Sequence, residues 1–178
     1  MIKKQTVLAL LLAIGIVFVP AHGARPLRED APHQHGVGKL KIAVARGELQ
    51  ISLDITAADV VGFEHAPRSA REGEAVEKAF TTLRNGPRVF ALSNKAGCAL
   101  RDAKAERGQE NGSQADGKVH SDISATYRYT CNQIESLRGI DVKLFSLFPK
   151  IRRLKVELAG RNTEVMTQVT RKHTRIAF

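Results

Sequence analysis

The stretch VGKLKIAVARGELQISLDI, from Val37 to Ile55, decides the fold. Apolar residues alternate with polar or small ones through both of its halves, which is the period of half-buried β-strands. The apolar positions are Leu40, Ile42, Val44, Leu49, Ile51, Leu53 and Ile55. Arg46-Gly47-Glu48 interrupts the alternation and predicts a hairpin turn between a strand at Val37 to Arg46 and a strand at Leu49 to Ile55.

One amphipathic helix is predicted after this hairpin. Ala57 to Pro67 reads as a tight loop or a short helical turn, and Ser69-x-x-Glu72 then forms a capping box. The predicted buried stripe of the helix is Val76, Ala79, Phe80 and Leu83. Asn85-Gly86-Pro87 ends it.

The second half of the chain predicts further strands. The clearest runs from Val119 to Cys131, and shorter alternating segments lie near residues 154–158, 165–169 and 174–178. Residues 103–118, AKAERGQENGSQADGK, have the polar composition of a flexible, disordered loop. The pattern predicts an α+β fold, a single sheet-dominated domain of mostly antiparallel strands with one main helix.

The first 23 residues predict a secretory signal peptide. Lys3 and Lys4 precede an unbroken apolar run from Val7 to Val19, and small residues allow cleavage between Gly23 and Ala24. The apolar run is short for a membrane-spanning helix. We therefore expect an exported protein whose mature part, Ala24 to Phe178, is one metal-binding domain.

Two cysteines, Cys98 and Cys131, lie in the mature part. In an oxidising compartment they are expected to form a disulfide bond. The alternative is a pair of thiolate zinc ligands, although Cys-x-x-Cys spacing is absent.

The charge balance is basic. The formal net charge is +10 for the whole chain, and removing Lys3 and Lys4 with the signal leaves +8. Such a balance favours anionic surfaces. Nucleic acid is a poor match because the chain has no Trp and its two tyrosines, Tyr127 and Tyr129, are strand residues. A solvated basic face is the simplest interpretation, and a face that binds an acidic partner is the alternative.

A metal is suggested by His33-Gln34-His35, which precedes the first strand. In an extended backbone the side chains at i and i+2 lie on one face, about 7 Å apart. Extending the alternation of the first strand backwards places both imidazoles on the polar side with Lys39 and Lys41. Zinc and copper both accept imidazole nitrogen. The alternative is a chance pair of histidines in an N-terminal arm.

Five segments together resemble the ZrgA-type family of periplasmic zinc-uptake proteins. They are HQHG at 33–36, DVVGFEHAP at 59–67, the lone Cys98 before a polar insertion, HSDISATYRYTC at 120–131 and LFSLFPKIRRLKVEL at 144–158. The resemblance spans about Pro32 to Phe178. It implies a periplasmic protein of Gram-negative bacteria that binds Zn²⁺ and assists the binding component of a high-affinity zinc ABC importer. The histidines that match the family's motifs are His33, His35, His65 and His120.

The sequence departs from the resemblance in the insertion. Relatives often carry a tract rich in His, Asp and Glu there, whereas residues 103–118 contain no histidine. A single defined ion is therefore expected rather than a scavenging arm. Glu64 and Asp122 are candidates for direct ligation or for orienting an imidazole. His173 is expected to be an ordinary surface histidine.

Three functional classes are compatible with the sequence. The first is a zinc-binding accessory protein of a transporter. The second is an envelope protein that uses its basic face to bind an acidic partner, with a purely structural metal. The third, a zinc hydrolase, fits poorly because the chain has no His-Glu-x-x-His helix and no nucleophile elbow. We therefore expect a protein that is not an enzyme.

Overall fold

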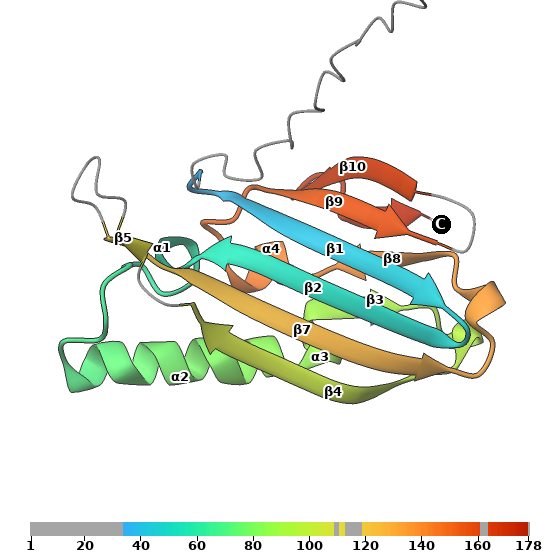
Figure 1. Cartoon of the computed structure of the whole chain (residues 1–178), viewed down its shortest axis with the longest axis horizontal. Helices are drawn as coiled ribbons and strands as arrows, with labels where there is room; N and C mark the ends of the chain where they lie inside the picture. Colours follow the sequence, from blue (N-terminus) through green and yellow to red (C-terminus); the bar gives the residue numbers. More distant parts are fainter. Residues whose placement is uncertain (1–33, 109–110, 113–118, 161–163, 178) are drawn as a thin grey trace, which may run out of the picture. The chain divides into compact units, whose positions relative to one another are not determined.

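The computed structural model describes residues 34–108, 111–112, 119–160 and 164–177. Its main element is a six-stranded sheet in the order β10-β9-β1-β2-β7-β4 (Figure 1). The strands are β1 (Val37–Ala45), β2 (Glu48–Thr56), β4 (Cys98–Arg107), β7 (Asp122–Cys131), β9 (Arg153–Ala159) and β10 (Glu164–Thr170). Neighbouring strands run antiparallel except β1 and β9, which run parallel. The predicted sheet-dominated α+β fold is confirmed.

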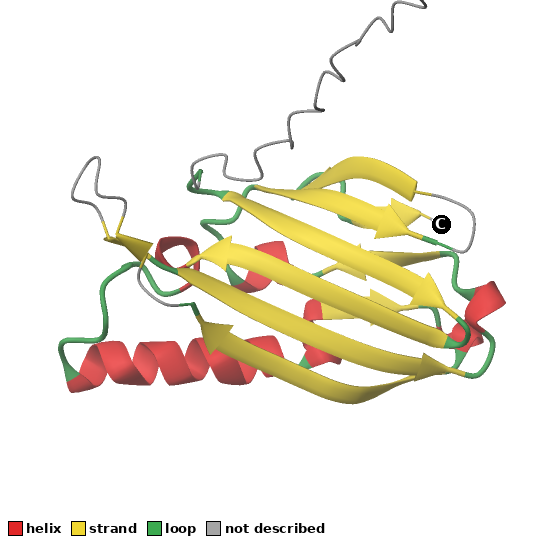
Figure 2. Ribbon diagram, viewed as in Figure 1, coloured by secondary structure: helices red, strands yellow, loops and turns green. Residues whose placement is uncertain are grey.

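Smaller elements cover one face of this sheet (Figure 2). A second sheet has the order β11-β8-β3, and β5 and β6 form a two-stranded ribbon. Their bounds are β3 (Phe90–Leu92), β5 (Asn111–Gly112), β6 (Val119–His120), β8 (Gly139–Val142) and β11 (Arg175–Ala177). The helices are α1 (Ala57–Val60), α2 (Ala70–Arg84), α3 (Gly86–Val89) and α4 (Leu144–Leu147), with 3-10 turns η1 (Asn94–Ala96) and η2 (Ile134–Ser136).

The hairpin that decides the fold forms as expected. Arg46 and Gly47 both have positive φ, 46° and 82°, the conformation of a two-residue turn that matches the twist of the flanking strands. Leu40 lies opposite Leu53 and Val44 lies opposite Leu49. The alternation therefore places one apolar face of both strands against the core.

Helix α2 also follows its sequence signals. The Ser69 hydroxyl accepts a hydrogen bond from the Glu72 amide at 3.2 Å, and the Glu72 carboxylate accepts one from the Arg68 amide at 2.6 Å. These two bonds satisfy amide groups at the start of the helix. The buried stripe is the predicted one, Val76, Ala79, Phe80 and Leu83.

The core lies between the six-stranded sheet and the elements that cover it. Phe90 from β3 meets Tyr127 from β7 edge to face, with ring centroids 5.1 Å apart. Burial raises the pKa of Tyr127 far above the ordinary tyrosine value and raises that of Tyr129 to about 12. The opposite face of the sheet is polar, with exposed Lys39 and Lys41 on β1.

The predicted disulfide is present. Cys98 and Cys131 are direct partners on β4 and β7, with Cα atoms 3.9 Å apart. The bond joins the two strands that flank the polar insertion.

Two boundaries predicted from the sequence are wrong. Residues 103–107 belong to β4 rather than to a loop, because the small side chains of Ala103 and Ala105 let α2 pack against this strand. Val119 to Cys131 is two strands, because the main chain leaves the ladder at Ser121. Most of the remaining predicted loop, residues 109–110 and 113–118, lies outside the described residues, as does the predicted signal peptide. Among the helices that the structure describes, none has the length and apolar character needed to cross a bilayer.

Candidate metal centre

Four strands of the large sheet meet at one end, which we call the histidine end. There β1 and β7 begin and β2 and β4 end, at the left of Figure 1. The Ala57 amide donates to the Ser121 carbonyl at 2.9 Å, and the Gly108 amide donates to the Asp122 carbonyl at 2.8 Å. These bonds bring together chain segments that carry four of the six residues proposed from the sequence, Glu64, His65, His120 and Asp122.

Asp59 ties the loop after β2 to the start of β1. Its side chain is 7% exposed, and its Oδ2 atom accepts hydrogen bonds from the Gly36 amide at 2.5 Å and from the Thr56 hydroxyl at 2.8 Å. A buried carboxylate that accepts two hydrogen bonds is compensated for part of its lost hydration. Asp59 thereby fixes Gly36 and with it the preceding residue in the chain, His35.

His35 lies in a turn rather than in an extended strand. The Val37 amide donates to the Gln34 carbonyl at 3.0 Å, and Gly36 has a φ of +79°. The predicted placement of His33 and His35 on one strand face is therefore wrong at His35, because the turn at Gly36 ends the alternation. His33 lies outside the described residues.

Arg107 organises the loop that carries Glu64 and His65. Its Nη2 atom donates to the Glu64 carbonyl at 2.6 Å, to the His65 carbonyl at 2.8 Å and to the Ser121 hydroxyl at 2.8 Å. The Ser121 hydroxyl, 2% exposed, donates to the Glu64 carbonyl at 2.7 Å. The guanidinium also lies over the Phe63 ring, 5.5 Å from its centroid. This network fixes the main chain on which both candidate side chains are mounted.

His35 and Glu64 come together at this end. The His35 Nδ1 atom lies 3.7 Å from the Glu64 Oε1 atom, and the two side chains are 60% and 14% exposed. An imidazole and a carboxylate at this separation are two zinc-ligand types supplied by distant chain segments. Glu64 is mostly buried, which argues against an ordinary surface acid.

His65 is held in a form suited to metal binding. Its ring stacks on Phe63 with centroids 4.9 Å apart, and its Nδ1 atom lies 2.8 Å from the Ala66 carbonyl oxygen. A carbonyl only accepts, so Nδ1 carries the proton and Nε2 carries the lone pair of the neutral ring. A histidine that ligates a metal commonly shows this arrangement, with its other nitrogen donating to a carbonyl.

The remaining candidates lie at the same end but are not seen to converge. Asp122 begins β7 opposite Thr56 and is partly buried. His120 lies in β6, where its main chain pairs with Asn111, and its side chain is outside what is described. Within the described ranges, no three His, Cys, Asp or Glu side chains stand close enough together to hold a metal ion.

Sequence reasoning missed the residues that support this end. Asp59, Phe63 and Ser121 occur within the segments that resemble the zinc-uptake family, and only their histidine and acidic neighbours were singled out. Arg107 was missed because it was placed in a loop. The signal that identifies it is its position at the end of a strand whose small residues face a helix.

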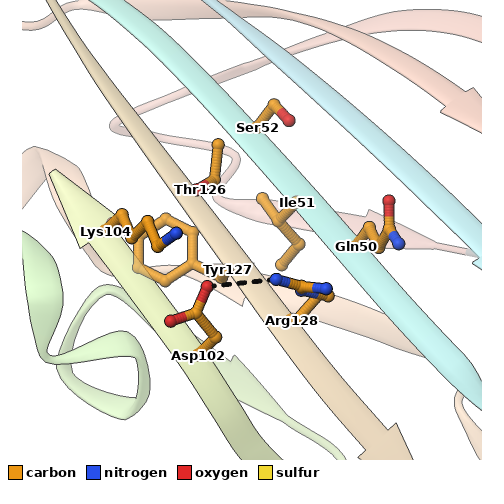
Figure 3. Close-up of a pocket in the computed structure, with 8 residues that line it drawn as sticks. All are labelled: Gln50, Ile51, Ser52, Asp102, Lys104, Thr126, Tyr127 and Arg128. Carbon is orange, nitrogen blue, oxygen red and sulfur yellow. Dashed lines mark hydrogen bonds and ion pairs between the residues drawn. The ribbon is translucent and has the colours of Figure 1, made fainter. Parts of the chain in front are cut away.

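A hollow away from the histidine end has different chemistry. It lies on the polar face of the sheet over β2, β7 and β4, with a volume of about 270 Å³ (Figure 3). Arg128 and Asp102 pair across it at 3.4 Å, and Lys104 lies beside them. No histidine or cysteine lines it, and its charges are already partly paired, so it is a weaker candidate for a metal than the histidine end.

Comparison with known proteins identifies the family of the chain. The family described as ZrgA family zinc uptake protein matches residues 32–178, which include every described residue. No curated protein matches the chain. A match of this extent, together with imidazole and carboxylate groups at one sheet end, leads to one conclusion. The chain belongs to the ZrgA family of zinc uptake proteins.

Proposed function

We propose that the chain captures Zn²⁺ at the histidine end and passes it to the binding component of a zinc ABC importer. The observation that carries the proposal is the approach of His35 to Glu64 within 3.7 Å, between segments that are 29 residues apart in sequence (64 − 35). His65 supplies a second imidazole in the same loop. His33, His120 and Asp122 complete the proposed set of ligands or of groups that orient them.

Transfer, rather than a structural or catalytic role, is supported by how this end is held. Asp59, Arg107 and Ser121 fix it through hydrogen bonds that involve no metal. A zinc ion that is not needed for folding can be released without unfolding the protein. The family's role in zinc uptake favours the same conclusion and gives no support to hydrolysis.

The predicted signal peptide and the disulfide support a periplasmic location for this activity. A disulfide between Cys98 and Cys131 persists in an oxidising compartment. The proposed mature protein starts at Ala24 and meets zinc after export. It acts as a binding protein and not as an enzyme.

Zinc titration of the mature chain by calorimetry tests the proposal. The wild type should bind zinc saturably, and the double variant His35→Ala/His65→Ala should bind at least about tenfold more weakly, because it loses both imidazoles described at the histidine end. His173→Ala is the matched control, since His173 is an exposed histidine in the turn after β10. Equal zinc affinity in the wild type and the double variant would reject this site.

Chelation distinguishes delivery from a structural metal. The protein treated with EDTA should keep its circular dichroism spectrum, and zinc should raise its melting temperature only through mass action. Unfolding on chelation would mean that the metal is part of the fold, and the delivery role would then be wrong.

A further inference from the structure

Three cations line a pocket next to His35. The pocket has a volume of about 540 Å³ and opens between the start of β1, the segment before β9 and the turn after β10. Its lining residues are His35, Gly36, Asp59, Pro149, Lys150, Arg152 and Arg171. His35 thus belongs both to this pocket and to the candidate metal centre.

The positive charges of this pocket are bonded to neutral groups. Lys150 donates to the Ala58 carbonyl at 3.4 Å, Arg152 donates to the His35 carbonyl at 3.1 Å, and Arg171 donates to the Ile151 carbonyl at 3.4 Å. A carbonyl carries no net charge. In the described part of the chain, no carboxylate forms an ion pair with any of the three.

Asp59, the one acidic residue in the lining, is already engaged in hydrogen bonds. Asp59 is buried, and its Oδ2 atom accepts from the Gly36 amide and the Thr56 hydroxyl. One carboxylate cannot balance three cations. The pocket therefore keeps an excess of positive charge at the place where a divalent cation is proposed to bind.

Arg152 is positioned in advance by the fold. Its amide donates to the Gly36 carbonyl at 2.9 Å, and its side chain lies over Gly36, where a Cβ atom would be 2.5 Å from Nε. Binding an anion to a guanidinium that is already held costs less conformational entropy than binding to a mobile one.

We propose that this pocket binds a carboxylate-bearing ligand that lies beside the zinc ion at His35 and offers it an oxygen. Carboxylate matches the fork of arginine and is also a zinc ligand. The three cations repel a Zn²⁺ ion at His35. A carboxylate bound between the cations and the ion offsets that repulsion. The coupling to zinc rests on the proposed function, whereas binding of the carboxylate itself does not.

The first test uses the metal-free mature protein. Calorimetric titration with tricarballylate, a tricarboxylate, should give saturable binding at low ionic strength. Arg152→Gln/Arg171→Gln should weaken it at least tenfold. Lys95→Gln/Arg101→Gln removes the same charge from the far end of the sheet and should change the affinity less than twofold. Equal losses in the two variants, or no saturable binding in the wild type, would overturn the proposal.

Two further ligands identify the source and the class of the anion. Binding of an acetylated tetra-aspartate peptide at least tenfold tighter than tricarballylate assigns the site to acidic side chains of a protein partner. The reverse order assigns it to a small polycarboxylate. Inorganic phosphate that binds more tightly than both would overturn the choice of carboxylate.

The second test measures coupling with zinc. The zinc-loaded protein should bind the carboxylate at least fivefold more tightly than the metal-free protein, and linkage requires the same factor for zinc. His35→Ala should abolish this increase, measured as the ratio of the variant's own affinities with and without zinc. Equal affinities with and without zinc would overturn the coupling. Absence of any zinc binding would instead reject the proposed function, while the metal-free titration would still decide whether the pocket binds carboxylate.

Discussion

Main-chain hydrogen bonds join chain segments at both ends of the six-stranded sheet, but one end adds a covalent bond whereas the histidine end adds polar side chains. The disulfide end has the bond between Cys98 and Cys131, and the Cys131 amide donates to the Gly47 carbonyl at 2.7 Å. At the histidine end, Asp59 and Arg107 bridge the segments. A disulfide contributes stability without offering ligands, whereas the side chains of Asp59 and Arg107 hold a loop that carries imidazole and carboxylate groups. The difference predicts that stability and zinc binding can be changed separately.

The largest expected effect on stability belongs to the disulfide end. Cys98→Ala/Cys131→Ala should lower the free energy of unfolding by about 2 to 4 kcal/mol, because the unfolded chain gains freedom when the cross-link is lost. Urea unfolding followed by circular dichroism measures this loss. Zinc affinity at a temperature where the variant is folded should stay within twofold of the wild type. A parallel fall in zinc affinity would mean that the two ends are not separable.

Removing Arg107 should affect both properties. Arg107→Ala leaves the His65 carbonyl without its donor, removes the guanidinium bonds to the Ser121 hydroxyl and the Glu64 carbonyl, and should cost about 1 to 3 kcal/mol of unfolding free energy. Zinc affinity should fall about tenfold, since Glu64 and His65 lose their support. Arg101→Ala is the matched control on the same strand, where an exposed guanidinium donates to Thr130 at 3.3 Å. It should change stability by less than about 0.5 kcal/mol and leave zinc binding intact.

Gly36→Ala should cost about 1 to 2 kcal/mol. The φ of +79° is strained for alanine, and the new methyl group would displace Arg152. Gly73→Ala is the contrasting control, because Gly73 lies in α2 with no atom within 4 Å of the added Cβ, so alanine should stabilise the helix by about 0.5 to 1 kcal/mol. Thermal unfolding of both variants gives the comparison. A neutral result at Gly36 would show that the turn before β1 can relax.

The smallest effect at neutral pH is expected in the core that both ends share. Among the described residues the Tyr127 hydroxyl has no hydrogen-bond partner, so Tyr127→Phe should change stability at pH 7 by less than about 0.5 kcal/mol. Burial raises the pKa of Tyr127, so above about pH 10 the unfolded chain loses this proton first and stability falls as pH rises. The variant should lose less stability between pH 9 and pH 11 than the wild type. A large loss at pH 7 would reveal a hydrogen bond to the hydroxyl.

Local patterns predicted much of this fold. The hairpin of β1 and β2, the cap and stripe of α2 and the disulfide were all confirmed, because each depends on residues near in sequence or on a single pair of cysteines. The boundary predicted between β4 and the loop was wrong. Ala103 and Ala105 are small because α2 packs closely against them, and small residues are also typical of a loop. The parallel pairing of β1 with β9 leaves no local signature.

The candidate site was predicted in part. Motif residues of the zinc-uptake family identified the end of the sheet, and His35 and Glu64 do lie together there. The geometry proposed for His35 was wrong, because alternation cannot anticipate a turn that a distant aspartate stabilises. Asp59, Arg107 and Ser121 act through hydrogen bonds between segments far apart in sequence, which no periodic pattern encodes.

The parallel pairing of β1 with β9 sets the order in which the protein can be completed. The Gly36 carbonyl accepts hydrogen bonds from the amides of Arg152 and Arg153, across a separation of 116 residues (152 − 36). Contacts this distant in sequence close late in folding. A chain that stops before Arg152 can still form the hairpin of β1 and β2. The backbone around His35 would then lack its neighbour at the start of β9. His35, the first described residue of the proposed zinc site, therefore gains this support only when the last fifth of the chain is in place.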